Sequence, residues 1–184
     1  EEEKFLTLFR QWGRDEEADA VAVLVDTGLR VGELLRLEDR DVNFEVGRNG
    51  IVYVWEAKAN TPGSVPLTKR AASILSRRIQ AVKRLDDKRL FPVPYARLHD
   101  AWERAKAVLG LHKDDQLVLH ALRHTFASRL VQKGVPIPVV KELMRHKTIA
   151  MTMRYAHLAP ANLLNAIAVL DHDGGALEKV DRSL

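Results

Sequence analysis

The residues best suited to chemistry lie in the C-terminal half of the chain, where His120 and Arg123 are followed by His146 and Tyr155. His120 and Arg123 are three residues apart, so on a helix they share one face and can converge on one ligand. A guanidinium matches the oxygens of a phosphate bidentately and keeps its charge at neutral pH. Since each of these residues alone is more often part of a solvated face, the phosphate hypothesis depends on the rest of the chain.

The segments around these residues predict the helices that must position them. Leu122, Phe126 and Leu130 recur at i, i+4 and i+8 and form one apolar face. This spacing predicts a helix over residues 120–133. Cap and proline signals predict further helices over residues 136–145, over residues 148–157 with Thr148 as the cap, and from Pro160 onward.

The N-terminal half changes from helical to strand periodicity and back. Helices are predicted over residues 5–12, 15–28, 32–37, 68–83 and 94–109. Short segments rich in β-branched or aromatic residues predict strands over residues 42–44, 51–55 and 64–67, with a stub of strand at 90–91. The fold class is therefore expected to be α+β, mostly helical, with a small three-stranded antiparallel sheet at one edge.

The composition narrows the class of protein. The net charge of +4 and the pI near 9.4 fit a nucleic-acid-binding protein, although the excess of positive charge is mild. The absence of cysteine excludes disulfides, cysteine-ligated zinc and thiol catalysis. The longest apolar run, residues 20–25, is too short to cross a membrane, and the N-terminus is not a signal peptide. We expect a cytoplasmic protein, and the missing initiator methionine suggests a piece of a longer chain.

Four motifs follow one another along the chain. Residues 27–34 read TGLRVGEL, residues 57–60 read AKAN before VPL at 65–67, residues 120–124 read HALRH, and residues 143–146 read LMRH before MTMRYAH at 151–157. In this order they resemble the catalytic domain of the tyrosine recombinases, the phage integrase family. The resemblance covers roughly residues 15–160.

The resemblance implies the central roles in a DNA strand transfer. Tyr155 would be the nucleophile that attacks a DNA phosphodiester, leaving a 3′-phosphotyrosyl bond and a free 5′-hydroxyl. Arg30 and Arg123 would hold the non-bridging oxygens of that phosphate. Lys58, at a hairpin, would protonate the leaving 5′-oxygen. The implied function is site-specific recombination or integration, in which strands are cut and rejoined without ATP.

The resemblance also assigns the remaining polar groups. His120 would act in proton transfer at the nucleophile, and His146 occupies a position that is His or Trp in the family. Glu33 and His124 would be supporting residues. The two arginines would replace a metal ion as the charge clamp, so neither a metal nor a cofactor is expected.

Three other interpretations compete with this one. His120 and His124 at i, i+4 invite a zinc site, but residue 121 is alanine where the metalloprotease motif has glutamate. A type IB topoisomerase shares the same chemistry and is the nearest rival, although the spacing of the last four catalytic residues fits a recombinase better. A DNA-binding module with an inactive site is the third, and the complete catalytic set argues against it.

The expected domain organisation is a catalytic domain over residues 1–170, a flexible tail over 171–184, and no N-terminal core-binding domain in this chain. The partner would be double-stranded DNA, with a homotetramer on synapsed DNA and a monomer as the isolated domain. An apolar stripe from Leu163 to Leu170 is expected to be donated to a neighbouring protomer, and packing on its own domain is the alternative.

One residue and one short segment depart from the family pattern. Arg145 stands where the family usually has glycine, which adds charge near the site and a possible phosphate contact. Residues 61–64 are not basic, so this hairpin is expected to grip DNA less. With the N-terminal domain missing, we predict weak and salt-sensitive DNA binding.

Overall fold

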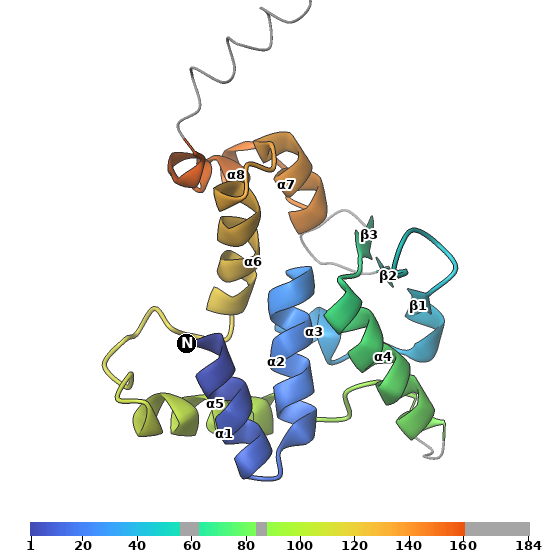
Figure 1. Cartoon of the computed structure of the whole chain (residues 1–184), viewed down its shortest axis with the longest axis vertical. Coiled ribbons are helices and arrows are strands. Elements are labelled where there is room, and N and C mark those ends of the chain that lie inside the picture. The colour runs from blue at the N-terminus through green and yellow to red at the C-terminus, as the bar shows by residue number, and fades with distance from the viewer. Residues whose placement is uncertain (56–62, 84–87, 161–184) are drawn as a thin grey trace, which may run out of the picture.

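The computed structural model describes residues 1–55, 63–83 and 88–160 (Figure 1). The helices are α1 Glu2–Gln11, α2 Asp15–Thr27, α3 Val31–Leu34, α4 Lys69–Val82, α5 Tyr95–Val108, α6 Ala121–Gln132, α7 Ile137–Met144 and α8 Ala150–Met153, with short 3-10 turns η1 Asp39–Asp41 and η2 Ala156–Leu158. The strands are β1 Val42–Asn43, β2 Ile51–Val54 and β3 Gly63–Pro66, in the order β1-β2-β3 with antiparallel pairing. The predicted α+β fold with a small antiparallel sheet is therefore confirmed.

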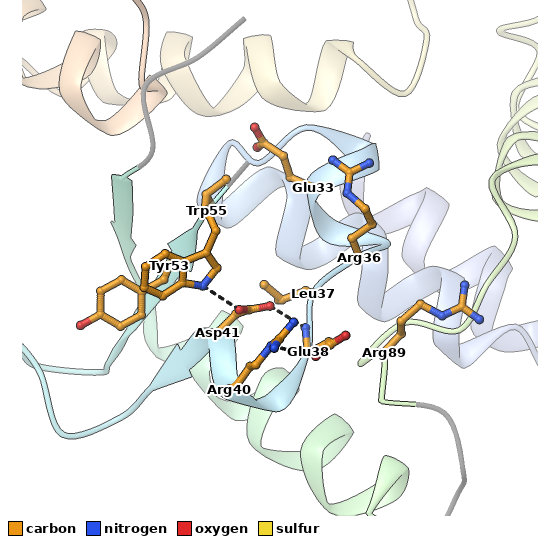
Figure 2. A pocket seen from close by; sticks show the side chains of 10 residues that line it. Glu33, Arg36, Leu37, Glu38, Arg40, Asp41, Tyr53, Trp55 and Arg89 are labelled. Carbon is orange, nitrogen blue, oxygen red and sulfur yellow. Dashed lines mark hydrogen bonds and ion pairs between the residues drawn. The ribbon is translucent and has the colours of Figure 1, made fainter. Parts of the chain in front are cut away.

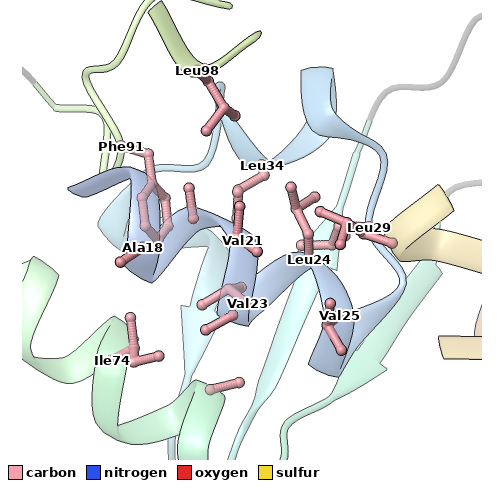
Figure 3. Close-up of a cluster of buried hydrophobic side chains, with 14 of the residues drawn as sticks. Ala18, Val21, Val23, Leu24, Val25, Leu29, Leu34, Ile74, Phe91 and Leu98 are labelled. Carbon is pink, nitrogen blue, oxygen red and sulfur yellow. The ribbon is translucent and has the colours of Figure 1, made fainter. Parts of the chain in front are cut away.

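Helix α2 is the centre of the main hydrophobic core. Residues 17–25 are all buried, so this helix is covered on every side rather than on one stripe. Figure 3 shows Val21, Leu24 and Val25 of α2 among the side chains of neighbouring elements, including Ile74 of α4 and Leu98 of α5. Such complete burial fixes the C-terminal end of α2, which leads directly into the first motif.

Carboxylates of α2, one of them fully buried, tie this helix to its neighbours. The Glu17 carboxylate is fully buried and accepts a hydrogen bond from Arg97 of α5 at 2.7 Å. Near the other end of α2, Asp26 accepts from the Arg70 guanidinium and from the Thr68 hydroxyl at the start of α4. Since a buried carboxylate without partners would be strongly unfavourable, these pairs set where α4 and α5 lie against α2.

Helix α6 connects two hydrophobic clusters. Leu122 in its first turn belongs to the main core, whereas Phe126 belongs to a second cluster with Val140 and Met144 of α7 and with Tyr155. Figure 1 shows α6 running between the body around α2 and the part formed by α7 and α8. Arg123 lies at the junction of the two clusters, which is where the site forms.

Gly28 permits the close approach of α2 to α6. It ends α2 with φ +64°, and a Cβ at this position would meet the ring of Phe126. Glycine is the one residue that adopts this conformation without steric strain and leaves room for the ring. The end of α2 therefore packs directly on the helix that carries Arg123.

The structure corrects two details of the predicted elements. The helix expected over residues 148–157 is broken into α8 and η2, and Thr148 does not cap it, since Ile149 is the N-cap residue and makes no side-chain cap hydrogen bond. Side-chain hydrogen bonds of Thr152 and Tyr155 to the rest of the domain hold this segment instead of a continuous helix. The strand pairing expected at 90–91 occurs one residue earlier, where Arg89 bridges Glu38.

The expected helix after Pro160 lies outside the described residues, and with it the question of whether that segment packs on its own domain. Within the described part of the chain, no helix is both long and apolar enough to cross a membrane.

Candidate active site

Arg30 reaches the site because α2 stops just before it. After Gly28 and the buried Leu29, Arg30 caps the short helix α3. The Glu33 carboxylate accepts from the Arg30 backbone N–H at 2.8 Å and from Arg30 Nη1 at 3.2 Å. Glu33 thereby fixes both the start of α3 and the guanidinium, whose side chain remains 32% exposed and open to a ligand.

Arg123 lies in the first turn of α6 and is more deeply buried than Arg30. It is 2% exposed, and its Nη1 and Nη2 donate to the backbone carbonyls of Gly28 and Met144. These contacts join the ends of α2 and α7 to α6. Burial, followed by the charges of Arg30 and Arg145, lowers the pKa of Arg123 to about 10. The guanidinium therefore still carries its charge at neutral pH, and its field acts on the whole site.

The two arginines open onto one cavity of about 300 Å³. Residues of α6, α7 and α8 and of the segments beside α3, α6, α7 and α8 line it. Among them are six that the sequence singled out: Arg30, His120, Arg123, His124, His146 and Tyr155. These residues span 125 positions of sequence between Arg30 and Tyr155. The fold brings them to a cavity that is large enough for a phosphate and part of its sugars.

Tyr155 lies between α8 and η2, and its hydroxyl faces into the domain. Its residue exposure is 5%, and its Oη is 2.5 Å from Nδ1 of His124. Burial raises the pKa of Tyr155, while the charges of Arg154 and Arg123 oppose that rise. The phenol therefore stays protonated at neutral pH when the cavity holds no ligand.

His146 follows α7, and a hydrogen bond to Thr152 holds its ring in place. Its Nδ1 lies 2.8 Å from the Thr152 hydroxyl, and the residue is 8% exposed. Burial, followed by the charges of Arg123, Arg30 and Arg145, lowers the pKa of His146 to about 4. The ring is therefore neutral at physiological pH and can offer a hydrogen bond but no charge.

His120 and His124 stand one turn apart at the start of α6. Their rings meet edge to face with centroids 5.0 Å apart. Burial, together with the positive charges of neighbouring side chains, lowers the pKa of both rings. Within the described residues no three His, Asp or Glu side chains gather as metal ligands. The neutral imidazole of His124, which contacts the Tyr155 hydroxyl, is suited to accept a proton, and His120 lines the same cavity.

The remaining predicted residue, Lys58, lies outside the described residues. The strands that flank its segment are described, and Tyr53 of β2 pairs with Ser64 of β3.

Three residues at the site were missed or incompletely anticipated by sequence reasoning. Arg154 lines the cavity and its guanidinium lies 6.0 Å from the centre of the Tyr155 ring. Thr152 holds His146, as described above. Arg145 was expected to add charge near the site, but its side chain is buried and binds Glu33 at 2.5 Å. A cation directly before the tyrosine was the one signal that could have pointed to Arg154.

A second hollow of about 610 Å³ lies behind Glu33 (Figure 2). The rings of Tyr53 and Trp55 stack on one side of it, and the indole N–H of Trp55 donates to Asp41 at 2.8 Å. Glu33 lines this hollow and not the site cavity. Glu33 therefore contacts Arg30 without lining the cavity onto which Arg30 opens.

The sequence is similar to those of known proteins. The profile of the phage integrase family matches residues 11–162. The tyrosine recombinase XerA of Saccharolobus solfataricus is 32% identical over 145 residues, which cover 79% of this chain and 47% of that protein. The integrase of Escherichia phage P2 is 30% identical over 165 residues, covering 88% of this chain and 44% of that protein. The chain thus spans about half the length of the curated relatives it matches.

Solved structures give the same picture of the fold. The catalytic domain of bacteriophage HP1 integrase superposes with a TM-score of 0.62 at 32% identity, covering 82% of this chain and 80% of that one. The Tn1549 transposon integrase, solved in complex with transposon right end DNA, gives a TM-score of 0.70 at 23% identity over 94% of this chain and 64% of that one. With the family profile covering most of the sequence, the chain belongs to the phage integrase family.

Proposed function

We propose that this chain carries the catalytic site of a site-specific DNA recombinase, which cuts and rejoins strands through a covalent bond to Tyr155. The observation that carries the proposal is the meeting of Arg30, Arg123 and the Tyr155 phenol at one cavity. Two guanidinium groups around a buried nucleophile suit a transition state in which negative charge spreads over phosphoryl oxygens.

In the proposed reaction Tyr155 Oη forms a bond to the scissile phosphorus as the bond from phosphorus to the 5′-oxygen breaks. The phenol proton passes to Nδ1 of His124, the atom 2.5 Å away, and not directly to His120, to which the family resemblance assigns proton transfer. The His120 ring contacts the His124 ring edge to face. Lys58 supplies the proton for the leaving 5′-oxygen, a role carried by the family resemblance alone. Because one phosphodiester replaces another, the reverse step rejoins strands without an external energy source.

The energies of these interactions can be compared with the cost of ionising the tyrosine. With a pKa near 10, ionising a tyrosine at neutral pH costs about 4 kcal/mol. One preorganised donor at a developing negative charge contributes about 3–4 kcal/mol. At about 3–4 kcal/mol each, Arg30 and Arg123 together exceed the ionisation cost of an unperturbed tyrosine. Burial raises the pKa of the Tyr155 phenol and so adds to that cost.

The partners follow from the same hypothesis. Double-stranded DNA is the substrate, and the homotetramer on synapsed DNA expected from the family is the working assembly. Support for DNA comes from the Tn1549 integrase, which was solved with transposon end DNA. We further propose that residues 1–170 form the catalytic domain, that an N-terminal domain outside this chain completes the grip on DNA, and that this chain alone binds weakly and in a salt-sensitive manner.

A covalent-capture selection tests the function directly. Purified protein is incubated with a pool of nicked duplexes of random sequence around the nick, so that strand cleavage releases a short fragment and traps the adduct. We expect adducts with wild-type protein and none with Tyr155→Phe, which lacks only the hydroxyl. If the Phe variant is trapped equally well, Tyr155 is not the nucleophile, and if neither protein is trapped, the inactive DNA-binding module is favoured.

The DNA sites recovered in this selection also distinguish a recombinase from a topoisomerase. A type IB topoisomerase relaxes supercoiled plasmid irrespective of sequence, whereas the proposed recombinase cleaves only sites recovered in the selection. Efficient relaxation of a plasmid that lacks any selected site would favour the topoisomerase.

A further inference from the structure

Arg145 has an unusual backbone for a residue with a side chain. It ends α7 with φ +51° and ψ +43°, and no other non-glycine residue in the described ranges has a positive φ. Left-handed positions of this kind at helix ends normally favour glycine. A strained arginine that persists beside a candidate active site calls for a compensating role of its side chain.

The Arg145 side chain is buried against the first motif and the sheet. Its residue exposure is 5%, and its Nη2 lies 2.5 Å from Oε2 of Glu33. Its methylene groups pack on Gly63 at the start of β3, where a Cβ would come within 3.2 Å of Arg145 Cδ. Its Nε and Nη1 are buried without hydrogen-bond partners among the described residues. The Glu33 carboxylate is therefore the group that holds this guanidinium.

Glu33 is shared between two arginines. Its Oε1 binds Arg30 Nη1 at 3.2 Å, and its Oε2 accepts both from the Arg30 backbone N–H and from Arg145. Without Arg145, the carboxylate would face Arg30 alone and offset much of its positive charge. With Arg145 present, the three groups together keep one net positive charge, and Arg30 is the member that faces the site cavity.

We propose that Arg145 is a positioning residue for Arg30: by pairing with Glu33, it neutralises the carboxylate that orients Arg30 and leaves the Arg30 charge available to the substrate phosphate. The inference rests on the proposed function, since it concerns the charge that meets the scissile phosphate. Arg145 does not touch the substrate. It acts through Glu33, which lines the second hollow (Figure 2) and does not line the site cavity.

The first test compares wild-type protein with Arg145→Gly on a nicked duplex recovered by the selection above. Glycine suits the left-handed backbone, so the variant removes the charge without adding strain. We expect the single-turnover rate of adduct formation at saturating protein to fall about 10- to 100-fold, the effect of losing one charged hydrogen bond. The half-saturating protein concentration should stay within about twofold, because the loss concerns the transition state.

A neutral substrate distinguishes a charge effect from a general loss of structure. On the same duplex with a methylphosphonate at the scissile position, one non-bridging oxygen and its charge are missing, so the Arg30 charge matters less. We expect the penalty of Arg145→Gly to shrink to about threefold or less there. An equal loss of rate on both substrates would mean a merely structural role and would overturn the proposal.

A double variant gives the sharpest outcome. If Arg145 serves to neutralise Glu33, then Glu33→Gln should recover much of the rate lost in Arg145→Gly, because an amide oxygen still accepts from the Arg30 N–H but carries no charge. A double variant that is as slow as Arg145→Gly, or slower, would contradict the inference.

A second substitution guards against a variant that does not fold. Arg145→Lys keeps the charge beside Glu33 and should cleave the phosphodiester within about fivefold of wild type, closer than Arg145→Gly. If Arg145→Gly is unfolded, a Lys variant slowed more than about 100-fold on both substrates overturns the proposal. If wild-type protein forms no adduct, the proposed function is refuted instead. This outcome is seen before any variant is made.

Discussion

His146 should make the stability of this domain unusually sensitive to mild acid. The ring is buried beside three arginines, and its pKa falls to about 4 as a result. In the unfolded chain the same ring takes up a proton near pH 6.5. Between these two values the unfolded state binds more protons than the folded state, so stability is fully present above pH 6.5 and is lost as the pH falls toward 4.

The size of this effect follows from the gap between the two pKa values. Each pH unit over which only the unfolded state is protonated removes about 1.4 kcal/mol. Between about pH 6.5 and pH 4.5, His146 should therefore reduce the free energy of unfolding by about 2–3 kcal/mol. For a domain whose total stability is on the order of 5–15 kcal/mol, this is a substantial share.

Urea unfolding of wild-type protein and His146→Asn at about pH 7 and about pH 4.5 measures the effect. Asn keeps a polar atom near the Thr152 hydroxyl but does not titrate. Other ionisable groups are common to both proteins and cancel in the difference. The variant should lose about 2–3 kcal/mol less than wild type on acidification. Equal losses in the two proteins would refute the claim that His146 is held neutral.

Further predictions concern the packing around the arginines. Arg123→Lys should lower the free energy of unfolding by about 2–4 kcal/mol in urea titrations and should abolish adduct formation, because one ammonium group cannot reach both backbone carbonyls. A variant as stable as wild type would contradict the buried guanidinium contacts. Gly28→Ala should destabilise by more than about 2 kcal/mol in thermal unfolding because its Cβ meets Phe126. Gly63→Ala should cost about 1 kcal/mol, and a double-mutant cycle with Arg145→Gly should remove that cost.

Much of the fold follows from local signals that tertiary contacts do not override. The N-cap at Thr68 accepts from the Ala71 N–H as its position before the helix predicts, and Gly28 ends α2 in the left-handed conformation. The helix carrying His120 and Arg123 begins and ends within a residue of its prediction. In these segments the capping residues and the apolar periodicity predict the same helix, so the local sequence is enough to define it.

The errors occur where distant contacts decide the structure. The segment with Tyr155 was predicted as one helix, yet hydrogen bonds from its side chains to His124 and His146 break it in two. Arg145 and Glu33 are 112 residues apart, so no local pattern could have paired them. The predicted role of Arg145 at a phosphate was therefore replaced by a buried ion pair, which only the folded chain reveals.

The assignment of Tyr155 as the nucleophile is tested most directly by locating the DNA on the protein. An adduct formed with a nicked duplex can be digested with nuclease and trypsin, and the masses of its peptides can be measured by mass spectrometry. Because Arg154 precedes Tyr155, trypsin releases a peptide that begins with the tyrosine. We predict that this peptide carries the nucleotide, linked through a 3′-phosphate to Tyr155. A nucleotide on any other residue, or a linkage through a 5′-phosphate, would contradict it.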